Sequence, residues 1–275
     1  MVRIIGFLVG LGFVAALLAG VLFTSHAFPE KTAVHEFHQH PKAVSFSSDG
    51  PFGKFDRAQL QRGLQVYKEV CSACHSLRLV AFGDLAALGY TEGQIKTFAK
   101  EYQIEQPSIN PETGEQATRK NLASDKFPWN FANDVAARQA NNNALPPDLS
   151  LITKAREGGP AYVYSLLTGY IDPPASLPKD ARPAPGLHYN PYFASLNLAM
   201  TPPLVSDGQV TYGEGAPKPT VDQMAKDVTA FLIWTAEPKL ENRHRAGLAS
   251  MIFLLIFAML TYMSYKSIWA DKKTH

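Results

Sequence analysis

A chain of 275 residues with 46% hydrophobic and 18% charged residues can form one large domain or two small ones and still contain membrane-spanning sequence. Its formal net charge of +2 is too small to favour nucleic acid as a partner, because binding a polyanion requires a strongly basic surface. Only two cysteines are present, so a framework of several disulfides is excluded.

The chain begins with an apolar stretch, Ile4–Phe23, which follows Arg3 and contains 20 residues without a charge. This length is sufficient to cross a bilayer, which favours a retained membrane anchor. The small residues Ser25 and Ala27 instead fit cleavage after Ala27, and residues 1–27 would then be a signal peptide. Both alternatives deliver the next segment to the same side of a membrane. The stretch lacks the Arg- and Ser-rich amphipathic character of a mitochondrial leader, which indicates a bacterial protein.

The next predicted element is a helix over Asp56–Val70. Asp56 is a favourable N-cap, because its carboxylate can accept a hydrogen bond from the first helical turn. Gly63 weakens this helix by about 1 kcal/mol relative to alanine, unless it allows another helix to pack closely. Apolar residues at helical spacing predict the buried face, and these are Leu60, Leu64 and Tyr67.

This helix leads directly into Cys71-Ser72-Ala73-Cys74-His75, which has the form CxxCH. Two thiols at this spacing can bond to the two vinyl groups of a haem, and the adjacent His75 can then bind the iron as the proximal ligand. A four-cysteine zinc site would need a second CxxC, and the chain has no further cysteine. A thioredoxin-like redox pair would lie within a βαβ pattern, which does not surround this motif. The motif therefore predicts one covalently attached c-type haem.

Between this motif and the carboxy-terminal region, the pattern predicts helices separated by proline-rich loops. Pro146 and Pro147 form a stiff apolar loop suited to lie against a flat macrocycle. The segment 171–203 is rich in proline, and so long a loop inside a domain is usually functional. Thr220 and Gln223 match a capping box at the start of a helix. The predicted helices are 91–102, 133–139, one from Pro160 to a C-cap at Gly169, and 220–237.

A six-coordinate haem iron needs a second axial ligand besides His75. Among the methionines, only Met200 and Met224 lie outside the start and the apolar carboxy-terminal stretch. Met224 falls on the apolar stripe of the 220–237 helix, where a core methionine is expected. Met200 lies near the end of the proline-rich segment, whose stiff backbone would hold a thioether in place. Met200 is therefore the preferred second ligand, and His188 is the alternative. His/Met ligation predicts a raised potential and a closed site that carries single electrons.

The carboxy-terminal stretch Ala246–Tyr265 also contains 20 residues without a charge, the length that crosses a hydrocarbon core of about 30 Å. Tyr265 and Trp269 fit the aromatic belt of a membrane interface. Because covalent haem attachment implies the exported side of an energy-transducing membrane, we predict three parts after the amino-terminal stretch. They are an exported haem domain over 28–245, a transmembrane helix over 246–265 and a cytoplasmic tail over 266–275.

Five motifs in this order resemble the cytochrome c1 family, whose members are the haem-bearing subunits of the cytochrome bc complex, respiratory complex III. The resemblance extends from about residue 53 to the end of the chain. It implies a mainly α-helical, cytochrome c-like haem domain with long proline-rich loops and a carboxy-terminal transmembrane helix. The motifs are GxxVYxEVCSACH at 63–75, NNNALPPDLS at 141–150, AREGGPAYVYSLLTGY at 155–170, LAMTPPL at 198–204 and MAKDVTAFLIWTAEP at 224–238.

The resemblance also implies roles for individual residues. The methionine of A-M-x-P-P is the axial ligand in such proteins and corresponds to Met200. The arginine of A-R-x-G-G lies beside a haem propionate and corresponds to Arg156, while the tyrosine after the two glycines borders the haem and corresponds to Tyr162. Pro146 and Pro147 would line the haem face. Some bacterial relatives brace the region before the axial methionine with a disulfide, for which this chain has no cysteines.

The function that the resemblance implies is that of an electron-transfer subunit of a quinol–cytochrome c reductase, with no catalytic site of its own. Such a subunit takes electrons from a Rieske iron–sulfur protein and passes them to a soluble or membrane-bound cytochrome c. It packs beside cytochrome b in a dimeric complex of the bacterial inner membrane, with the haem domain on the periplasmic side. Two alternatives remain, a haem-based sensor or ligand-binding protein and the cytochrome subunit of a periplasmic dehydrogenase.

Overall fold

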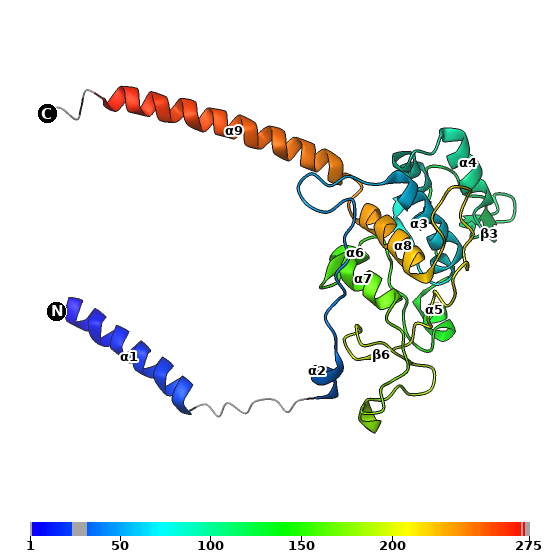
Figure 1. The fold of residues 1–275 in the computed structure, drawn as a ribbon, viewed down its shortest axis with the longest axis horizontal. Helices are drawn as coiled ribbons and strands as arrows, with labels where there is room; N and C mark the ends of the chain where they lie inside the picture. Colours follow the sequence, from blue (N-terminus) through cyan, green and yellow to red (C-terminus); the bar gives the residue numbers. More distant parts are fainter. Residues whose placement is uncertain (1, 24–31, 271, 273–275) are drawn as a thin grey trace.

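The structure is a computed structural model that describes residues 2–23, 32–270 and 272 (Figure 1). These residues form mainly helices, together with three short two-stranded antiparallel sheets. The predicted fold class, a mainly α-helical domain with long loops and apolar helices at the ends of the chain, is therefore confirmed.

Two helices at the centre of the domain pack along each other, α3 (Arg57–Glu69) and α8 (Val221–Ala236) (Figure 1). Both begin at a predicted N-cap. The Asp56 carboxylate accepts a hydrogen bond from the first turn of α3, and the Thr220 hydroxyl does the same for α8. The capping box predicted at Thr220 is only half formed, because the side chain of Gln223 donates to Asp227 instead.

Gly63 lies at the closest approach of these two helices. A Cβ placed on it would lie 2.1 Å from the backbone oxygen of Asp227 and 2.6 Å from the Cβ of Phe231. Of the two roles open to Gly63, close packing against another helix is therefore the correct one. The predicted core residues of α3, Leu60, Leu64 and Tyr67, are all buried, as is Met224 on the predicted apolar stripe of α8. Val228, Phe231 and Trp234 of α8 are buried as well.

A second pair of helices, α6 (Ile152–Ala155) and α7 (Gly159–Leu167), packs on α8. As predicted, a proline lies in the first turn of α7. The predicted C-cap at Gly169 is wrong, because α7 ends with Thr168 as its C-cap. Gly169 is needed for a different reason: a Cβ there would lie 2.4 Å from the ring of Tyr192.

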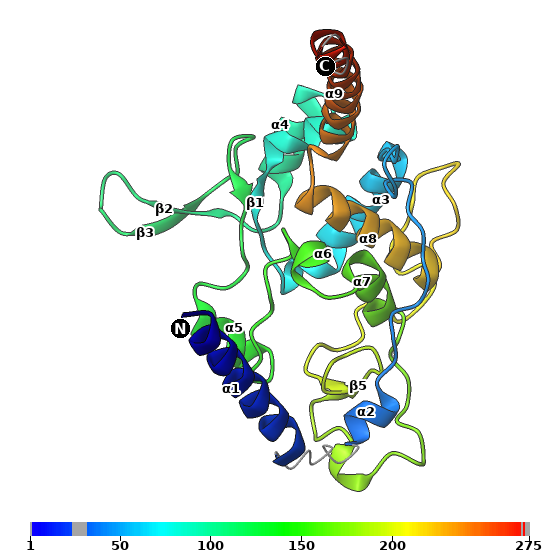
Figure 2. The same ribbon diagram turned by 90° about the vertical axis from the view of Figure 1, so that its left-hand side faces the viewer.

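An aromatic cluster forms the other part of the core, around Phe82. The ring centroid of Phe82 lies 4.3 Å from that of Phe127 and 5.3 Å from that of Tyr102. The predicted helices over 91–102 and 133–139 are present as α4 and α5, and the β2–β3 hairpin projects from the domain (Figure 2). The elements of this region are β1 (Leu77–Ala81), η2 (Phe82–Leu88), α4 (Glu92–Glu101), β2 (Gln106–Ile109), β3 (Gln116–Arg119), β4 (Lys126–Phe127) and α5 (Asp134–Ala140).

The proline-rich segment 171–203 is mostly loop, as predicted. It contains one turn of 3-10 helix, η3 (Lys179–Ala181), and a short antiparallel hairpin of β5 (His188–Tyr189) and β6 (Asn197–Leu198). The segment has a small core of its own, formed by the buried residues Leu177, Tyr189 and Leu196.

Two long apolar helices, α1 (Val2–Phe23) and α9 (Leu240–Trp269), contain the two predicted membrane stretches. Both are long and apolar enough to cross a membrane, and the apolar part of each is exposed along its length. α9 extends away from the domain as a single helix (Figure 1). It begins before residue 246 because its first turn packs on the domain, where Leu240 is buried and Glu241 accepts a hydrogen bond from Phe55 N.

Candidate haem-binding site

The CxxCH motif follows α3 directly and forms a tight turn, η1 (Cys71–Ala73). The backbone N–H groups of Cys74 and His75 both donate to the carbonyl of Cys71, at 3.1 and 2.9 Å. Both cysteines are free thiols and partly buried. Burial, together with the neighbouring Cys74, raises the pKa of Cys71 to about 12. The turn therefore holds two protonated thiols and one imidazole within five residues.

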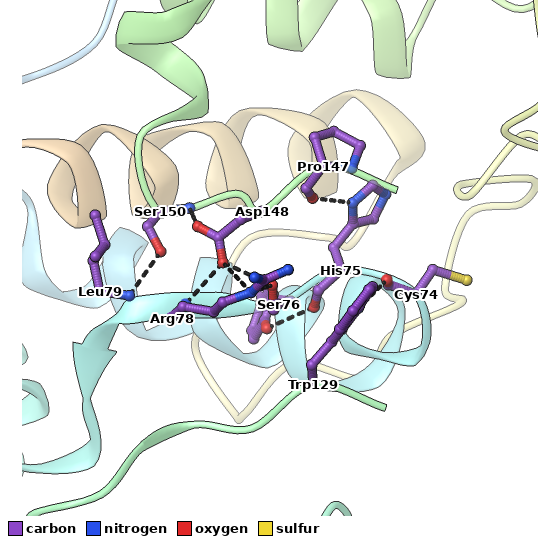
Figure 3. A network of polar contacts seen from close by, with 10 residues as sticks. Cys74, His75, Ser76, Arg78, Leu79, Trp129, Pro147, Asp148 and Ser150 are labelled. Atoms are coloured by element: carbon purple, nitrogen blue, oxygen red, sulfur yellow. Dashed lines mark hydrogen bonds and ion pairs between the residues drawn. The ribbon is translucent and has the colours of Figure 1, made fainter. Parts of the chain in front are cut away.

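The imidazole of His75 is held by one hydrogen bond, from Nδ1 to the backbone oxygen of Pro147 at 2.7 Å (Figure 3). A carbonyl oxygen can only accept, so Nδ1 carries the hydrogen and Nε2 keeps a free lone pair. Burial lowers the pKa of His75, while Pro147 and the Asp148 charge oppose that effect. A neutral imidazole with a free Nε2 is the form that binds iron, so the donor set fits a c-type haem.

The carbonyl groups of the motif are held by side chains from other elements. Trp129 Nε1 donates to the Cys74 oxygen at 3.0 Å (Figure 3). Asn130 Nδ2 donates to the Ala73 oxygen at 2.9 Å, and the buried Tyr67 donates its hydroxyl hydrogen to the His75 oxygen at 2.9 Å. These bonds fix the backbone of the turn from both sides, because they come from α3 and from the segment after β4.

Asp148 joins the loop after the two prolines to the strand after the motif. Its Oδ2 accepts from Ser76 Oγ at 2.7 Å and from Arg78 N at 2.8 Å, while its Oδ1 accepts from Ser150 N at 2.9 Å (Figure 3). Burial alone would raise the pKa of Asp148, but hydrogen bonds from Arg78, Ser150 and Ser76 outweigh it and hold the pKa below its ordinary value. The carboxylate therefore fixes Pro147, whose carbonyl orients His75.

The residues around Met200 come from two parts of the chain, the proline-rich segment and α7 with the residues that follow it. Met200 is half-buried, and its carbonyl accepts a hydrogen bond from the Tyr170 hydroxyl at 3.0 Å. Burial and the neighbouring Tyr162 raise the pKa of Tyr170, which keeps this hydroxyl a donor. Tyr162 is half-buried, and burial raises the pKa of its hydroxyl. The positive charge of the exposed Arg156 acts in the opposite direction. The ring of His188 lies edge-on to Tyr170, with centroids 6.5 Å apart.

The predicted residues thus form two groups. His75 lies with Pro147 and the two cysteines, and Met200 lies with Tyr162 and Arg156 through Tyr170. Pro146 is half-buried and Pro147 is exposed apart from its bonded carbonyl. The sequence does not mark five residues that hold these groups: Tyr67, Trp129, Asn130, Asp148 and Tyr170. Tyr67, Asp148 and Tyr170 lie inside motifs that carry the family resemblance, whereas Trp129 and Asn130 lie outside all five motifs.

Comparison with known proteins gives a family model and several similar chains. The model described as "Cytochrome C1 family" matches residues 46–272. "Cytochrome c1, heme protein, mitochondrial" of Saccharomyces cerevisiae is 44% identical over 254 residues, 92% of this chain and 80% of that protein. "Cytochrome c1" of Rhodospirillum rubrum is 42% identical over 240 residues, 83% of this chain and 87% of that protein.

A further relative, "Cytochrome b/c1" of Bradyrhizobium diazoefficiens, is 43% identical over 279 residues, which is 94% of this chain. The chain spans 39% of the length of that relative, which is a longer protein. The family model matches well over half of the chain, and the relatives from yeast and Rhodospirillum are matched over more than two thirds of their length. With the CxxCH turn and the oriented imidazole of His75, these matches show that the chain belongs to the cytochrome c1 family.

Proposed function

We propose that this chain is the electron-transfer subunit of a cytochrome bc complex and carries one covalently bound haem c. The observation that supports this most directly is the hydrogen bond between His75 Nδ1 and Pro147, beside two free thiols. Cys71 and Cys74 would hold the haem through thioether bonds, and His75 Nε2 would bind its iron. A haem bound there supplies reversible one-electron transfer.

The second axial ligand in this proposal is Met200. The hydrogen bond from Tyr170 holds the carbonyl of Met200, so the position of the thioether depends on a fixed backbone. Arg156 would pair with a haem propionate, since its side chain is exposed beside Tyr162. Tyr162, Pro146 and Pro147 would border the haem and keep water from its faces.

The haem domain in this proposal comprises residues 28–245 and lies on the periplasmic side of the bacterial inner membrane. The span over 246–265 would anchor it, and residues 266–275 would form a cytoplasmic tail. Both alternatives for residues 1–27 are compatible with the apolar helix α1. Ala27, the proposed cleavage position, lies outside the described residues.

The partners in this proposal are a Rieske iron–sulfur protein as donor and a soluble or membrane-bound cytochrome c as acceptor. Cytochrome b would pack beside α9 in a dimeric complex. The relative named cytochrome b/c1 supports an association of the two cytochromes. Co-purification of cytochrome b with the chain would separate this function from that of a dehydrogenase subunit.

The ligand assignment is tested by Met200→Leu, with Met224→Leu as the matched control. Met224 is fully buried in α8, so its replacement changes packing alone. A thioether stabilises ferrous iron. We therefore expect Met200→Leu to lower the midpoint potential by more than about 60 mV, a change that shifts a one-electron equilibrium tenfold.

The same variant should lose quinol–cytochrome c reductase activity in membranes, while Met224→Leu keeps both properties near those of the unaltered chain. If Met200→Leu keeps its potential and its activity, Met200 is not the ligand and His188 becomes the candidate. Rapid binding of carbon monoxide by the reduced, unaltered protein would indicate an open sixth position and would support the sensor instead.

A further inference from the structure

A short segment, Gln39–Lys42, lies across two elements of the site, and we refer to it as the strap. In Figure 2 the chain that follows α2 (Ala33–Phe37) runs alongside α7. At one end of the strap, Gln39 N donates to Pro191 O at 2.8 Å, within the turn of the β5–β6 hairpin. At the other end, Lys42 N donates to Ser165 Oγ of α7 at 2.8 Å.

The side chain of Lys42 ends at the carboxyl end of α7. Its ammonium donates to Thr168 O at 3.0 Å and to Thr168 Oγ1 at 2.8 Å. Thr168 is the C-cap of α7, where the helix dipole favours a cation. Burial lowers the pKa of Lys42 and the charge of Asp222 opposes that effect, so the ammonium is partly removed from water. Hydrogen bonds of a charged group are stronger in such a place than in bulk water.

The same ammonium faces the ring of Tyr192, 5.3 Å from its centroid, and the ring of Tyr164, 5.9 Å from its centroid. Both distances are within the range of cation–π attraction. Tyr192 belongs to the turn of the hairpin, and its ring lies directly against Gly169. One cation therefore connects the end of α7 to the hairpin.

The β5–β6 hairpin determines the position of Met200. Its strands pair Tyr189 with Asn197 and His188 with Leu198, and Met200 follows β6 after one intervening residue. A second bond, from Asn190 Nδ2 to Leu166 O at 2.8 Å, also joins the hairpin to α7. Removing the ammonium of Lys42 would therefore loosen the hairpin without detaching it.

The middle of the strap touches the turn before α7. A Cβ on Gly158 would lie 2.8 Å from Pro41 Cγ, so the proline ring rests on the bare backbone there. Gly158 has a φ of +78°, which an L side chain rarely adopts. It lies between Arg156 and Tyr162, the residues that would border the haem. The strap thus contacts both segments that would surround the Met200 side of the iron.

We propose that Lys42 is a positioning residue for the axial methionine, which it holds in place by joining the β5–β6 hairpin to the end of α7. The inference rests on the proposed function, since it takes Met200 as the second ligand. Lys42 acts on Met200 indirectly, through the contacts of its ammonium with Thr168 and with the ring of Tyr192.

The test uses the full-length, haem-loaded chain purified in detergent, as Lys42→Met, Lys42→Arg and Lys226→Met. Lys226 is the matched control, because its ammonium lies 5.8 Å from the centroid of the same Tyr164 ring but makes neither the Thr168 nor the Tyr192 contact. Its ion pair is with Asp222, whose charge also acts on Lys42. Two quantities report on the methionine: the far-red absorption band of ferric iron bound to thioether sulfur, and the rate at which carbon monoxide binds the ferrous form.

Loss of a charged hydrogen bond shifts an equilibrium by about tenfold. We expect carbon monoxide to bind Lys42→Met about tenfold faster and the far-red band to vanish at a lower temperature than global unfolding followed by circular dichroism. Lys42→Arg should restore most of both properties, and Lys226→Met should match the unaltered chain. A merely structural role would move the band and global unfolding together.

Equal carbon monoxide rates in Lys42→Met and Lys226→Met would overturn the inference. So would loss of the band only at the temperature of global unfolding. If the unaltered chain itself lacks the far-red band, both the inference and the assignment of Met200 fail. If the band is present there but insensitive to Lys42, the inference about Lys42 fails alone.

Discussion

Gly63 is the residue on which the packing of α3 against α8 depends, because a Cβ there would lie 2.1 Å from backbone and 2.6 Å from the Cβ of Phe231. An alanine can fit only if the two helices move apart, and overpacking of a core costs about 1–3 kcal/mol. We expect Gly63→Ala to lower the free energy of unfolding by about 2 kcal/mol, which is the upper end of that cost less about 1 kcal/mol that alanine gains in helix propensity. Unfolding of the full-length, haem-loaded chain followed by circular dichroism measures this.

The matched control is Gly93→Ala in the first turn of α4, where a Cβ would meet nothing within 4 Å. Alanine is the better helix former, so this variant should gain about 0.5 kcal/mol. Equal effects of the two substitutions would show that helix propensity, and not the contact with α8, determines the result at Gly63.

At the residue scale, the sequence predicts those site residues that are neighbours along the chain. Cys71, Cys74 and His75 lie in one five-residue motif, so the sequence alone predicts their chemistry. Trp129 is 55 residues away from its partner Cys74 in the motif, and Asp148 is 72 residues away from its partner Ser76, which directly follows the motif. No local pattern marks such a bond, because it exists only after the loops have packed.

At the scale of elements, the predicted helices are those with a capping residue and an apolar stripe, both of which are local signals. Asp56, Thr91, Asn133 and Thr220 each cap the helix that they were expected to begin or precede. The hairpin of β5 and β6 was not predicted, since strands of two residues show no alternating pattern. The sequence predicts a helix cap at Gly169, but the glycine is required there because the ring of Tyr192, from another segment, leaves no room for a Cβ.

The carboxylate of Asp125 stabilises the connection between β3 and β4, and we expect this stabilisation to depend on pH. Asp125 accepts from both terminal nitrogens of Arg119, at 2.6 and 2.9 Å, and from Leu122 N at 2.7 Å. The hydrogen bond from Arg119 is the main reason that the pKa of Asp125 lies below its ordinary value. Because the folded-state pKa is lowered, the stabilisation is present above the unfolded-state pKa and is lost as the pH falls through the folded-state value.

We therefore expect Asp125→Asn to be less stable than the unaltered chain by about 0.5–1 kcal/mol at neutral pH, a value reduced for the exposure of the pair to solvent. The difference should shrink to zero in acid, below the folded-state pKa of Asp125. Denaturant unfolding at a series of pH values measures it, with Glu112→Gln in the exposed β2–β3 turn as the control. A difference that stays constant with pH would show that the ionised carboxylate is not the cause.

At the scale of the whole molecule, the two apolar helices follow from composition alone, but the beginning of α9 does not. Its first turn belongs to the domain: Leu240 is 6% exposed, and Glu241 accepts from Phe55 N at 2.9 Å and lies 3.5 Å from Arg57. His244 Nδ1 lies 3.2 Å from Gly53 O. These contacts join the first turn of α9 to the start of α3 and to the residues just before it, and the other end of α3 leads into the CxxCH turn.

Two truncations separate the part of α9 that holds the domain from the part that would hold the membrane. A chain ending at Arg245 keeps Leu240, Glu241 and His244, so its unfolding temperature in detergent should equal that of the full chain. A chain ending at Lys239 exposes the pocket of Leu240 and leaves Phe55 N without its acceptor. Those losses amount to about 2–3 kcal/mol, and they should lower the unfolding temperature by about 4–12 °C.

Whether the chain that ends at Arg245 is found in the membrane or in solution shows whether residues 1–27, which contain the other apolar helix, are retained or cleaved. With 246–265 removed, Ile4–Phe23 is the remaining stretch long enough to cross a bilayer. If residues 1–27 are cleaved, the truncated chain is released from the membrane as a soluble haem protein, and its mass is that of residues 28–245 plus one haem. If they are retained, it stays membrane-bound at the higher mass. Equal unfolding temperatures for the two truncations would contradict a role of the first turn of α9 in the domain, whichever mass is found.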